Sequence, residues 1–273
     1  MQKGGIHLPI LFLCLALAGG CTRAPAPAPF PGEAAGLDPA IPAAYEARLA
    51  VRYQREGDPA KAVQARWRAG PEGTLLVSAH YGPLVPLLAL AVHPDSFYLN
   101  LTRENLFARS DSLYLLRGGS GRFSAGKAGL WMRAILEPHT LAALLFRPHS
   151  SERNGMRILR GLADGPSGRL VAEVWRDGAT GRIRQWSIDD VDGRRYLIVE
   201  YPDDAWGDGD FLPARVMLFW PGEQSRLWIQ VSRVKGLDPP PLIEQFRLRE
   251  PPDSERIDLK NPMDPMLLDS PDR

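Results

Sequence analysis

Cysteine is scarce in this sequence, and the two that occur restrict its chemistry. The 273 residues include only Cys14 and Cys21. Cys14 lies in an N-terminal segment that we expect to be removed, as argued below. The mature chain would then keep Cys21 alone. An intramolecular disulfide, a cysteine nucleophile and a cysteine metal site are therefore not expected.

An excess of charge of either sign is also missing. Lysine and arginine number 33 against 32 aspartate and glutamate residues, which gives a formal net charge of +1. Nothing here points to nucleic acid as a partner. Beyond the N-terminal segment, no apolar run is long and uncharged enough to be a transmembrane helix. The length fits one domain of about 200 residues with tails.

Motifs for catalysis and metal binding are lacking as well. No two of the five histidines have the spacing of a helical metal site, and no Gly-x-Ser-x-Gly nucleophile motif occurs. The aspartate-rich stretch from Asp203 to Asp210 lacks the ligand register and closing glutamate of a calcium-binding EF-hand, which favours a hairpin turn. We therefore expect no enzyme activity, no cofactor and no bound metal.

The N-terminus does carry a recognisable signal. Lys3 precedes a short apolar run at residues 8–18, which is followed by Gly19, Gly20 and Cys21. This order predicts a signal peptide over residues 1–20 that ends in a lipobox, with Cys21 as the lipid anchor and first mature residue. Ala18 stands where such motifs most often have leucine, so an ordinary secretory signal with an incidental cysteine is the alternative.

Residues 21–42 after the signal are rich in proline and alanine, which cannot pack a core. We interpret this segment as an extended tether between a membrane and the domain. By the sorting rule of enteric bacteria, Thr22 after the cysteine, in place of aspartate, predicts delivery to the outer membrane. The protein is therefore expected to be lipid-anchored there and to face the periplasm.

Alternating apolar and polar residues predict that most of the domain, residues 43–248, is β-strand. Residues 62–69 alternate cleanly, and Asp-Gly or Pro-Gly turns predict hairpins for residues 170–189 and 214–234. Residues 43–49 are predicted to form a short helix. Residues 129–146 have helical spacing interrupted by Pro138, which predicts two short helices. Strands resume after Ser150, and residues 249–273 are expected to be a disordered tail.

Strands, a helical insertion and further strands indicate a long, curved antiparallel sheet whose concave face the helices cover. If the helices fill that face only in part, a hydrophobic cavity remains. The alternative is that the same side chains fill the core. The cavity candidates are Val63, Trp67, Phe97, Leu99, Leu101, Leu141, Leu144, Leu145, Trp186, Ile188, Val216, Leu218, Leu227 and Ile229.

Three features occur in a distinctive order: a strand, an apolar loop and a strand in residues 74–101, the helical stretch from Trp131 to Leu145, and the closing hairpin that begins near Leu212. Together they resemble the LolA and LolB family of outer-membrane lipoprotein localisation proteins. The resemblance implies an unclosed antiparallel β-barrel of about eleven strands with a helical lid. It also implies a LolB-like monomer that accepts acyl chains from a periplasmic LolA-like carrier.

LolB has an exposed leucine in the loop between two strands that is important for membrane insertion. The matching loop here runs from Tyr81 to Pro86, so the resemblance implies that Leu84, with Val85 beside it, contacts membrane or cargo. Pro86 departs from the family pattern. Two functions stay open: an outer-membrane lipoprotein that binds acyl chains and aids their delivery, or a non-catalytic docking lipoprotein that uses the same sheet with a filled core.

Overall fold

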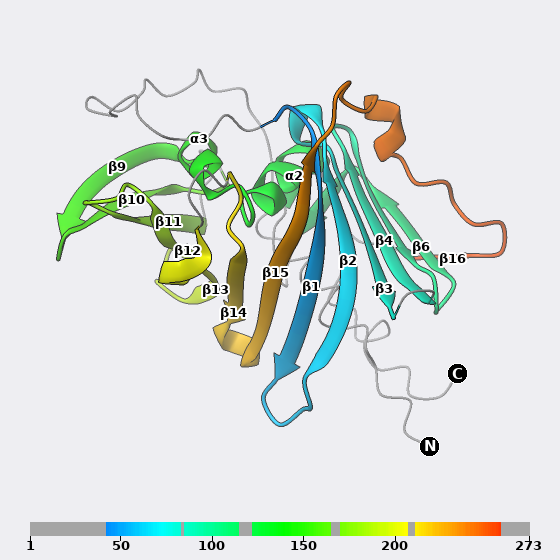
Figure 1. The fold of residues 1–273 in the computed structure, drawn as a ribbon, viewed down its shortest axis with the longest axis horizontal. Coiled ribbons are helices and arrows are strands. Elements are labelled where there is room, and N and C mark those ends of the chain that lie inside the picture. The colour runs from blue at the N-terminus through cyan, green and yellow to red at the C-terminus, as the bar shows by residue number, and fades with distance from the viewer. Residues whose placement is uncertain (1–41, 83–84, 115–121, 165–169, 207–210, 258–273) are drawn as a thin grey trace.

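One large β-sheet that does not close on itself dominates the fold. The structure, a computed structural model, describes residues 42–82, 85–114, 122–164, 170–206 and 211–257. Its 14-stranded sheet has the order β16-β6-β5-β4-β3-β2-β1-β15-β14-β13-β12-β11-β10-β9, with β16 and β9 at opposite edges (Figure 1). Neighbours pair antiparallel except β16 and β6, which are parallel.

Sixteen strands and two short α-helices are found among the described residues, together with five 3-10 turns. The strands are β1 (Tyr45–Arg55), β2 (Lys61–Ala69), β3 (Leu75–Tyr81), β4 (Val85–His93), β5 (Ser96–Leu101), β6 (Leu106–Ser110), β7 (Ser112–Tyr114), β8 (Arg122–Ser124), β9 (Phe146–Arg153), β10 (Met156–Leu162), β11 (Leu170–Asp177), β12 (Ile183–Asp190), β13 (Arg195–Glu200), β14 (Arg215–Trp220), β15 (Ser225–Gly236) and β16 (Glu255–Arg256). The helical elements are η1 (Pro71–Gly73), α2 (Ala125–Arg133), η2 (Pro138–Thr140), α3 (Leu141–Leu144), η3 (Asp203–Ala205), η4 (Pro221–Glu223) and η5 (Ile243–Phe246). None of the described helices is long and apolar enough to cross a membrane.

The two predicted hairpins are confirmed, and local hydrogen bonds explain them. In the β11–β12 turn, Asp177 Oδ1 accepts hydrogen bonds from the backbone N–H groups of Ala179 and Thr180 at 2.9 and 2.8 Å. Gly181 then adopts φ +71°, a conformation that glycine reaches without a Cβ penalty. The β14–β15 hairpin turns through η4. The mostly-β, unclosed sheet with a helical cover is thus confirmed, with 14 strands in place of about eleven.

The sheet has an inner face, which α2, η2 and α3 cover, and an outer face on the opposite side. Along each central strand the side chains alternate between buried and more exposed positions, as in β2, because successive residues point to opposite faces. The buried side chains form one continuous core that includes residues from Tyr45 to Val231. Within it, the ring centroids of Trp131 in α2 and Trp186 in β12 lie 5.7 Å apart. The core therefore lies between the sheet and its helical cover.

The helix predicted for residues 43–49 is wrong, because this segment begins the central strand β1. Tyr45, Ala47 and Leu49 are buried at alternate positions, and β1 pairs with β2 on one side and β15 on the other. Alanine, glutamate, arginine and leucine favour helices locally. Two flanking strands supply hydrogen bonds and packing that outweigh that modest preference.

Two boundaries also differ from expectation at the sheet edges. Strand β9 begins at Phe146 and pairs with β10, so strands resume earlier than Ser150. The predicted disordered tail is wrong over residues 249–257. Glu255 N donates to Asn105 O at 2.9 Å, and β16 extends the sheet beside β6. Edge strands leave unpaired backbone groups, which the C-terminal segment satisfies here. Residues 258–273 lie outside the described part.

The same C-terminal segment packs on the outer face of β4, β5 and β6. Leu248 packs against Ala91, Tyr98 and Phe107, whose side chains point outward from β4, β5 and β6. Burying these groups stabilises the docking of the segment, because each large apolar side chain contributes about 1.5–3 kcal/mol when fully buried. The outer faces of β2, β1, β15 and β14 lie on the other half of the sheet.

We expect Glu223→Gln to stabilise the protein at neutral pH by about 1 kcal/mol. Burial in the β14–β15 turn raises the pKa of Glu223 from its usual 4.5 to about 6, with Arg55 opposing the shift. Ionisation therefore costs more in the folded chain than in the unfolded one, and stability falls as pH rises from 4.5 to 6. The shift corresponds to about 2 kcal/mol at most, which partial solvent access reduces. Urea unfolding at pH 7.5 should show the gain, and at pH 4 the two proteins should match. A gain of equal size at both pH values would contradict this origin.

Candidate functional site

The structure brings the predicted cavity residues together on the inner face. All of them except Leu144 belong to the one core cluster, and Leu144 packs against it. Apart from Leu144, which is partly buried, each is exposed by 8% or less. The set therefore forms a continuous apolar surface beneath the helical cover. In this conformation, that surface is occupied by the protein's own side chains.

A buried ion pair joins the helical cover to the sheet. Arg133 at the end of α2 donates from Nε and Nη2 to the two carboxylate oxygens of Glu137, both at 2.8 Å. Glu137 is 2% exposed, and Tyr45 of β1 donates its hydroxyl proton to Oε1 at 2.7 Å. Arg133 Nη1 also donates to the carbonyl of Gly70 at 2.6 Å. These contacts hold α2 against β1 and the β2–β3 connection.

The Tyr45 hydroxyl is well suited to this role. Burial raises its pKa well above the usual value, and the Glu137 carboxylate raises it further. The group consequently stays protonated and donates to Glu137, while Trp67 Nε1 donates to its oxygen at 3.3 Å. The Tyr45 phenol and a carboxylate–guanidinium pair that lies far later in the chain thus satisfy one another.

Tyr201, just after β13, makes a second attachment. Its hydroxyl lies 3.2 Å from the carbonyl oxygen of Ala134 and 3.0 Å from that of Ile135, and Trp186 Nε1 donates to it at 2.9 Å. Burial raises the pKa of Tyr201 far above its ordinary value, so the hydroxyl remains a donor. It satisfies the carbonyl groups that the C-terminal end of α2 leaves without helical partners.

Close backbone packing seats α2 on the 3-10 turn η1. A Cβ added to Gly129 would lie 2.1 Å from the carbonyl oxygen of Gly73 and 2.9 Å from Val92 Cγ1. Only glycine permits this approach. None of these attachment residues was predicted from the sequence. The four-residue spacing of Arg133 and Glu137 before Pro138 was a signal for one ion pair. Tyr45, which donates to Glu137, and Tyr201, which contacts the carbonyl groups of Ala134 and Ile135, lie far away in the sequence.

The loop that the family resemblance points to is described only in part. Leu84 lies outside the described residues. Val85 is the first residue of β4 and is 51% exposed, and it pairs with Tyr81, which is 58% exposed. Tyr81 was not singled out from the sequence. These two side chains place exposed apolar surface at the β3–β4 tip.

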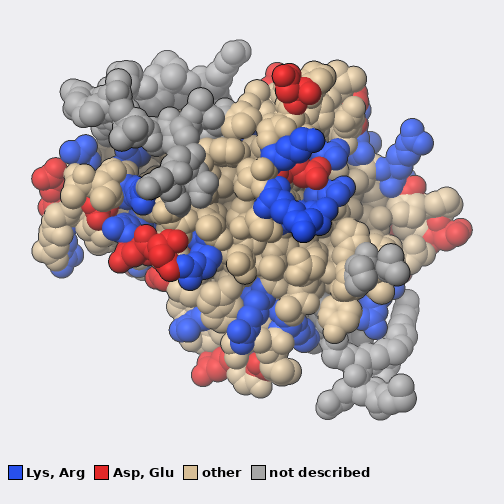
Figure 2. Space-filling view, viewed as in Figure 1, with Lys and Arg blue, Asp and Glu red and all other residues tan. Residues whose placement is uncertain are grey.

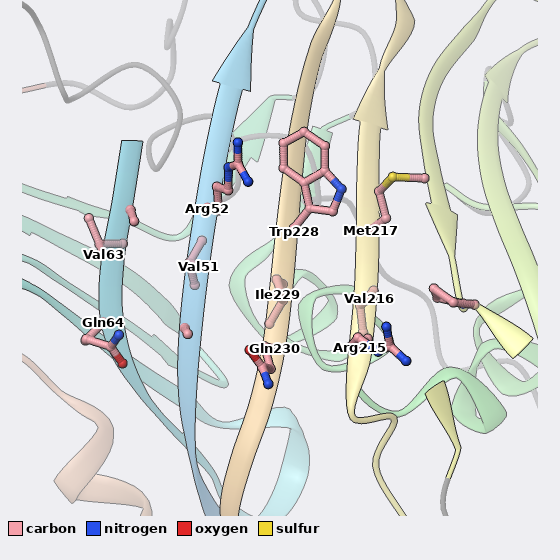
Figure 3. Close-up of a pocket in the computed structure, with 13 residues that line it drawn as sticks. Val51, Arg52, Val63, Gln64, Arg215, Val216, Met217, Trp228, Ile229 and Gln230 are labelled. Atoms are coloured by element: carbon pink, nitrogen blue, oxygen red, sulfur yellow. The ribbon is translucent and has the colours of Figure 1, made fainter. Parts of the chain in front are cut away.

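A separate pocket of about 450 Å³ opens on the outer face. Its lining comes from β1, β2, β14 and β15, with Pro202 at one side. Figure 3 shows Arg52, Trp228 and Met217 in one row across neighbouring strands, and Gln64, Gln230 and Arg215 in the next. Ala50 of β1 lies in this second row, between Gln64 and Gln230, and its small side chain leaves a hollow there. The predicted residues Val63, Val216 and Ile229 border this pocket as well as the inner core.

Polar residues elsewhere are engaged in structural contacts. Asp189 accepts hydrogen bonds from Arg195 at 2.9 and 3.1 Å, Asp203 pairs with Arg184, and Asp204 pairs with Arg215. No group of three or more histidine, cysteine, aspartate or glutamate residues suited to a metal ion occurs in the described ranges.

Comparison with known proteins rests on structure alone. No protein-family model and no curated protein matches the sequence. A solved LolA superfamily protein from Nitrosomonas europaea superposes with a TM-score of 0.55 over 77% of this chain and 93% of that chain, at 12% identity. The fold is LolA-like. A putative outer membrane lipoprotein-sorting protein domain from Vibrio parahaemolyticus covers 72% of this chain and 86% of its own, with TM-score 0.49 and 12% identity.

Proposed function

We propose that the protein is an exported lipoprotein that binds acyl chains of lipoproteins or lipids and aids their delivery to the outer membrane. Residues 1–20 would serve as the signal peptide, Cys21 as the anchor and residues 21–42 as the tether. The domain acts without catalysis, faces the periplasm and receives cargo from a LolA-like carrier. The observation that carries the proposal is the continuous apolar inner face, covered by short helices that a few polar contacts hold in place.

Magnitudes favour exchange of the helical cover for an acyl chain. Opening the cover breaks the hydrogen bonds of Glu137 and Tyr201, each contributing about 1 kcal/mol and more where a charge takes part. It also exposes apolar side chains of α2 and α3. Each methylene buried in return contributes about 0.8 kcal/mol, so ten of them supply roughly 8 kcal/mol. An acyl chain therefore offsets the lost hydrogen bonds, and the exchange is favourable when the chain also covers the apolar surface that α2 and α3 leave; a short polar ligand does neither.

The direct test is acyl binding by the purified, delipidated protein. We expect native mass spectrometry to detect a complex with a triacylated lipopeptide and with palmitate, and no complex with the deacylated peptide. Failure to take up any acylated ligand under conditions where the protein stays folded would contradict acyl binding.

A second candidate function is supported by the complete burial of the inner face. Side chains exposed by 8% or less resemble an ordinary filled core. On this alternative the protein is an envelope docking lipoprotein, and the sheet itself binds another protein. Cross-linking in cells that captures a defined protein partner, together with lipid-free native mass spectra, would favour it.

We expect Leu84→Glu to reduce transfer of bound acyl cargo to vesicles at least tenfold, because a charge in an apolar membrane contact is costly. Acyl binding itself should be unchanged, since the loop lies at the β3–β4 tip. The matched control is Leu242→Glu, at a leucine that is 68% exposed elsewhere on the surface. Equal transfer by wild type and Leu84→Glu would remove the loop from the mechanism.

A further inference from the structure

The uncovered half of the outer face is strongly basic. Outward positions of β1, β2, β14 and β15 include one acidic side chain, Glu46, which is held between Arg66 and Arg68 at 3.3 and 3.1 Å. We call the six arginines on these positions the arginine face: Arg48, Arg52, Arg66, Arg68, Arg215 and Arg226. Figure 2 shows basic side chains gathered at both ends of an uncharged central area on the side of the molecule formed by these strands.

Several of these arginines have no acidic partner among the residues that the structure describes. No described carboxylate forms an ion pair with Arg48, Arg52 or Arg226, and all three are exposed. Arg52 lies over the Trp228 ring at 5.6 Å from its centroid, and Arg226 over Phe219 at 5.2 Å. These cation–π contacts hold the guanidinium groups beside the aromatic rings and leave their N–H groups available to an anion.

The pocket in the middle of the arginine face combines charge with apolar surface. Arg52 and Arg215 flank it, and Trp228 and Met217 form the wall between them (Figure 3). Both apolar side chains are only partly buried. A cationic rim beside an aromatic and a thioether group suits a ligand with an anionic head and an apolar body.

We propose that the arginine face binds the anionic surface of a phospholipid bilayer, with a headgroup phosphate in the pocket beside Arg52. This proposal deepens the proposed function and rests on it, because the proposed function supplies the Cys21 anchor and the tether. Pro42, at the end of the predicted tether, packs beside Gly236 at the end of β15, and Leu237 N donates to Ala44 O at 2.9 Å. The tether thus joins the domain at β1 and β15, two of the strands that carry the arginines.

This placement favours the bilayer over an acidic protein as the occupant. An extended segment of residues 22–42 spans at most roughly 65 Å, so anchoring at Cys21 keeps the arginine face continually within reach of headgroups. Arginines spread over four strands match a dispersed layer of phosphates. Each cationic side chain near an anionic membrane contributes about a fivefold increase in binding.

The test compares three variants of the chain from residue 21, each carrying Cys21→Ser so that no acyl anchor contributes. The buried core of the described residues runs from Ala44 to Phe246, so this chain retains the domain. The first variant replaces Arg48, Arg52 and Arg226 with glutamine, and the second replaces the same residues with lysine. The matched control replaces Arg103, Arg153 and Arg249, exposed arginines elsewhere, with glutamine. Co-sedimentation uses vesicles with about 30 mol % phosphatidylglycerol and vesicles of phosphatidylcholine alone.

We expect the unsubstituted chain to bind the anionic vesicles and release them at high salt. The glutamine variant of the arginine face should bind roughly 100-fold more weakly, whereas the lysine variant and the control stay within about fivefold. Equal binding to both vesicle types, equal losses in the glutamine variant and the control, or binding of an acidic protein with no vesicle binding would each overturn the proposal. Acyl uptake measured on the same preparations separates the two proposals, because loss of vesicle binding leaves the inner face intact.

Discussion

Glu137→Ala is expected to lower the free energy of unfolding by about 3–5 kcal/mol. The substitution leaves the Arg133 guanidinium, whose side chain is 12% exposed, without its carboxylate partner, and it removes the acceptor of the Tyr45 hydroxyl. Breaking one side of a buried pair costs more than the pair contributes, because an uncompensated charge remains in a poorly solvated place. Urea unfolding monitored by tryptophan fluorescence measures the change.

Two further variants identify the source of this loss. The pair Arg133→Met with Glu137→Leu removes both charges and should recover the part of the loss that comes from the unpaired guanidinium. About 1 kcal/mol for the hydrogen bond to Gly70 and about 1–3 kcal/mol for the Tyr45 hydroxyl, which again lacks its acceptor, should remain lost. Glu152→Ala removes a carboxylate that is 77% exposed and paired with Arg157 at 3.7 Å, and should change stability by less than 0.5 kcal/mol. A loss below about 1 kcal/mol for Glu137→Ala would show that the ion pair does not hold the helical cover.

The sheet was largely predictable because strand signals are local. The alternation of Val63, Ala65 and Trp67 sets which face of β2 is buried, and the turn residues around Asp177 set the β11–β12 register. The prediction failed at β1, where residues 43–49 have helix-favouring composition. Only pairing with β2 and with β15, nearly 180 residues later in the chain, determines that strand.

The attachments of the helical cover could not be derived in the same way. Tyr45 and Glu137 are 92 residues apart, and Tyr201 lies 66 residues from Ile135. A tyrosine in a strand indicates that its ring is buried, but it does not indicate which group its hydroxyl hydrogen-bonds. The outer pocket depends on the same kind of non-local arrangement, because Arg52, Trp228 and Met217 form a row only once three strands have paired.

Tyr201→Phe is expected to increase the apparent affinity for acyl ligands by roughly 30-fold while lowering the stability of the protein. The phenylalanine ring fits the same space but leaves the carbonyl groups of Ala134 and Ile135 without their shared donor. Leaving buried acceptors unpaired costs about 2 kcal/mol in the closed form only. The ratio of open to closed forms therefore rises by roughly 30-fold, and binding that requires the open form strengthens in proportion.

The matched control is Tyr98→Phe, which removes a hydroxyl from a buried tyrosine on the outer face. This control should leave acyl affinity unchanged. If Tyr98→Phe also raised the affinity, the cause would be a general destabilisation of the sheet and not release of the helical cover. Titration with a fluorescent fatty acid and urea unfolding are measured on both variants.

The sign of the Tyr201→Phe effect separates the two candidate functions. If acyl chains and the helical cover compete for the inner face, weakening the cover must strengthen binding. If the inner face is a permanent core, the same substitution destabilises the fold and yields no binding at any ligand concentration. Loss of the Tyr201 hydroxyl creates no new attraction for an apolar ligand. A gain in affinity therefore means that the closed form has been destabilised relative to the open form. Such a gain would identify α2 and its neighbours as a lid, and its absence would leave the docking function as the better account of the same sheet.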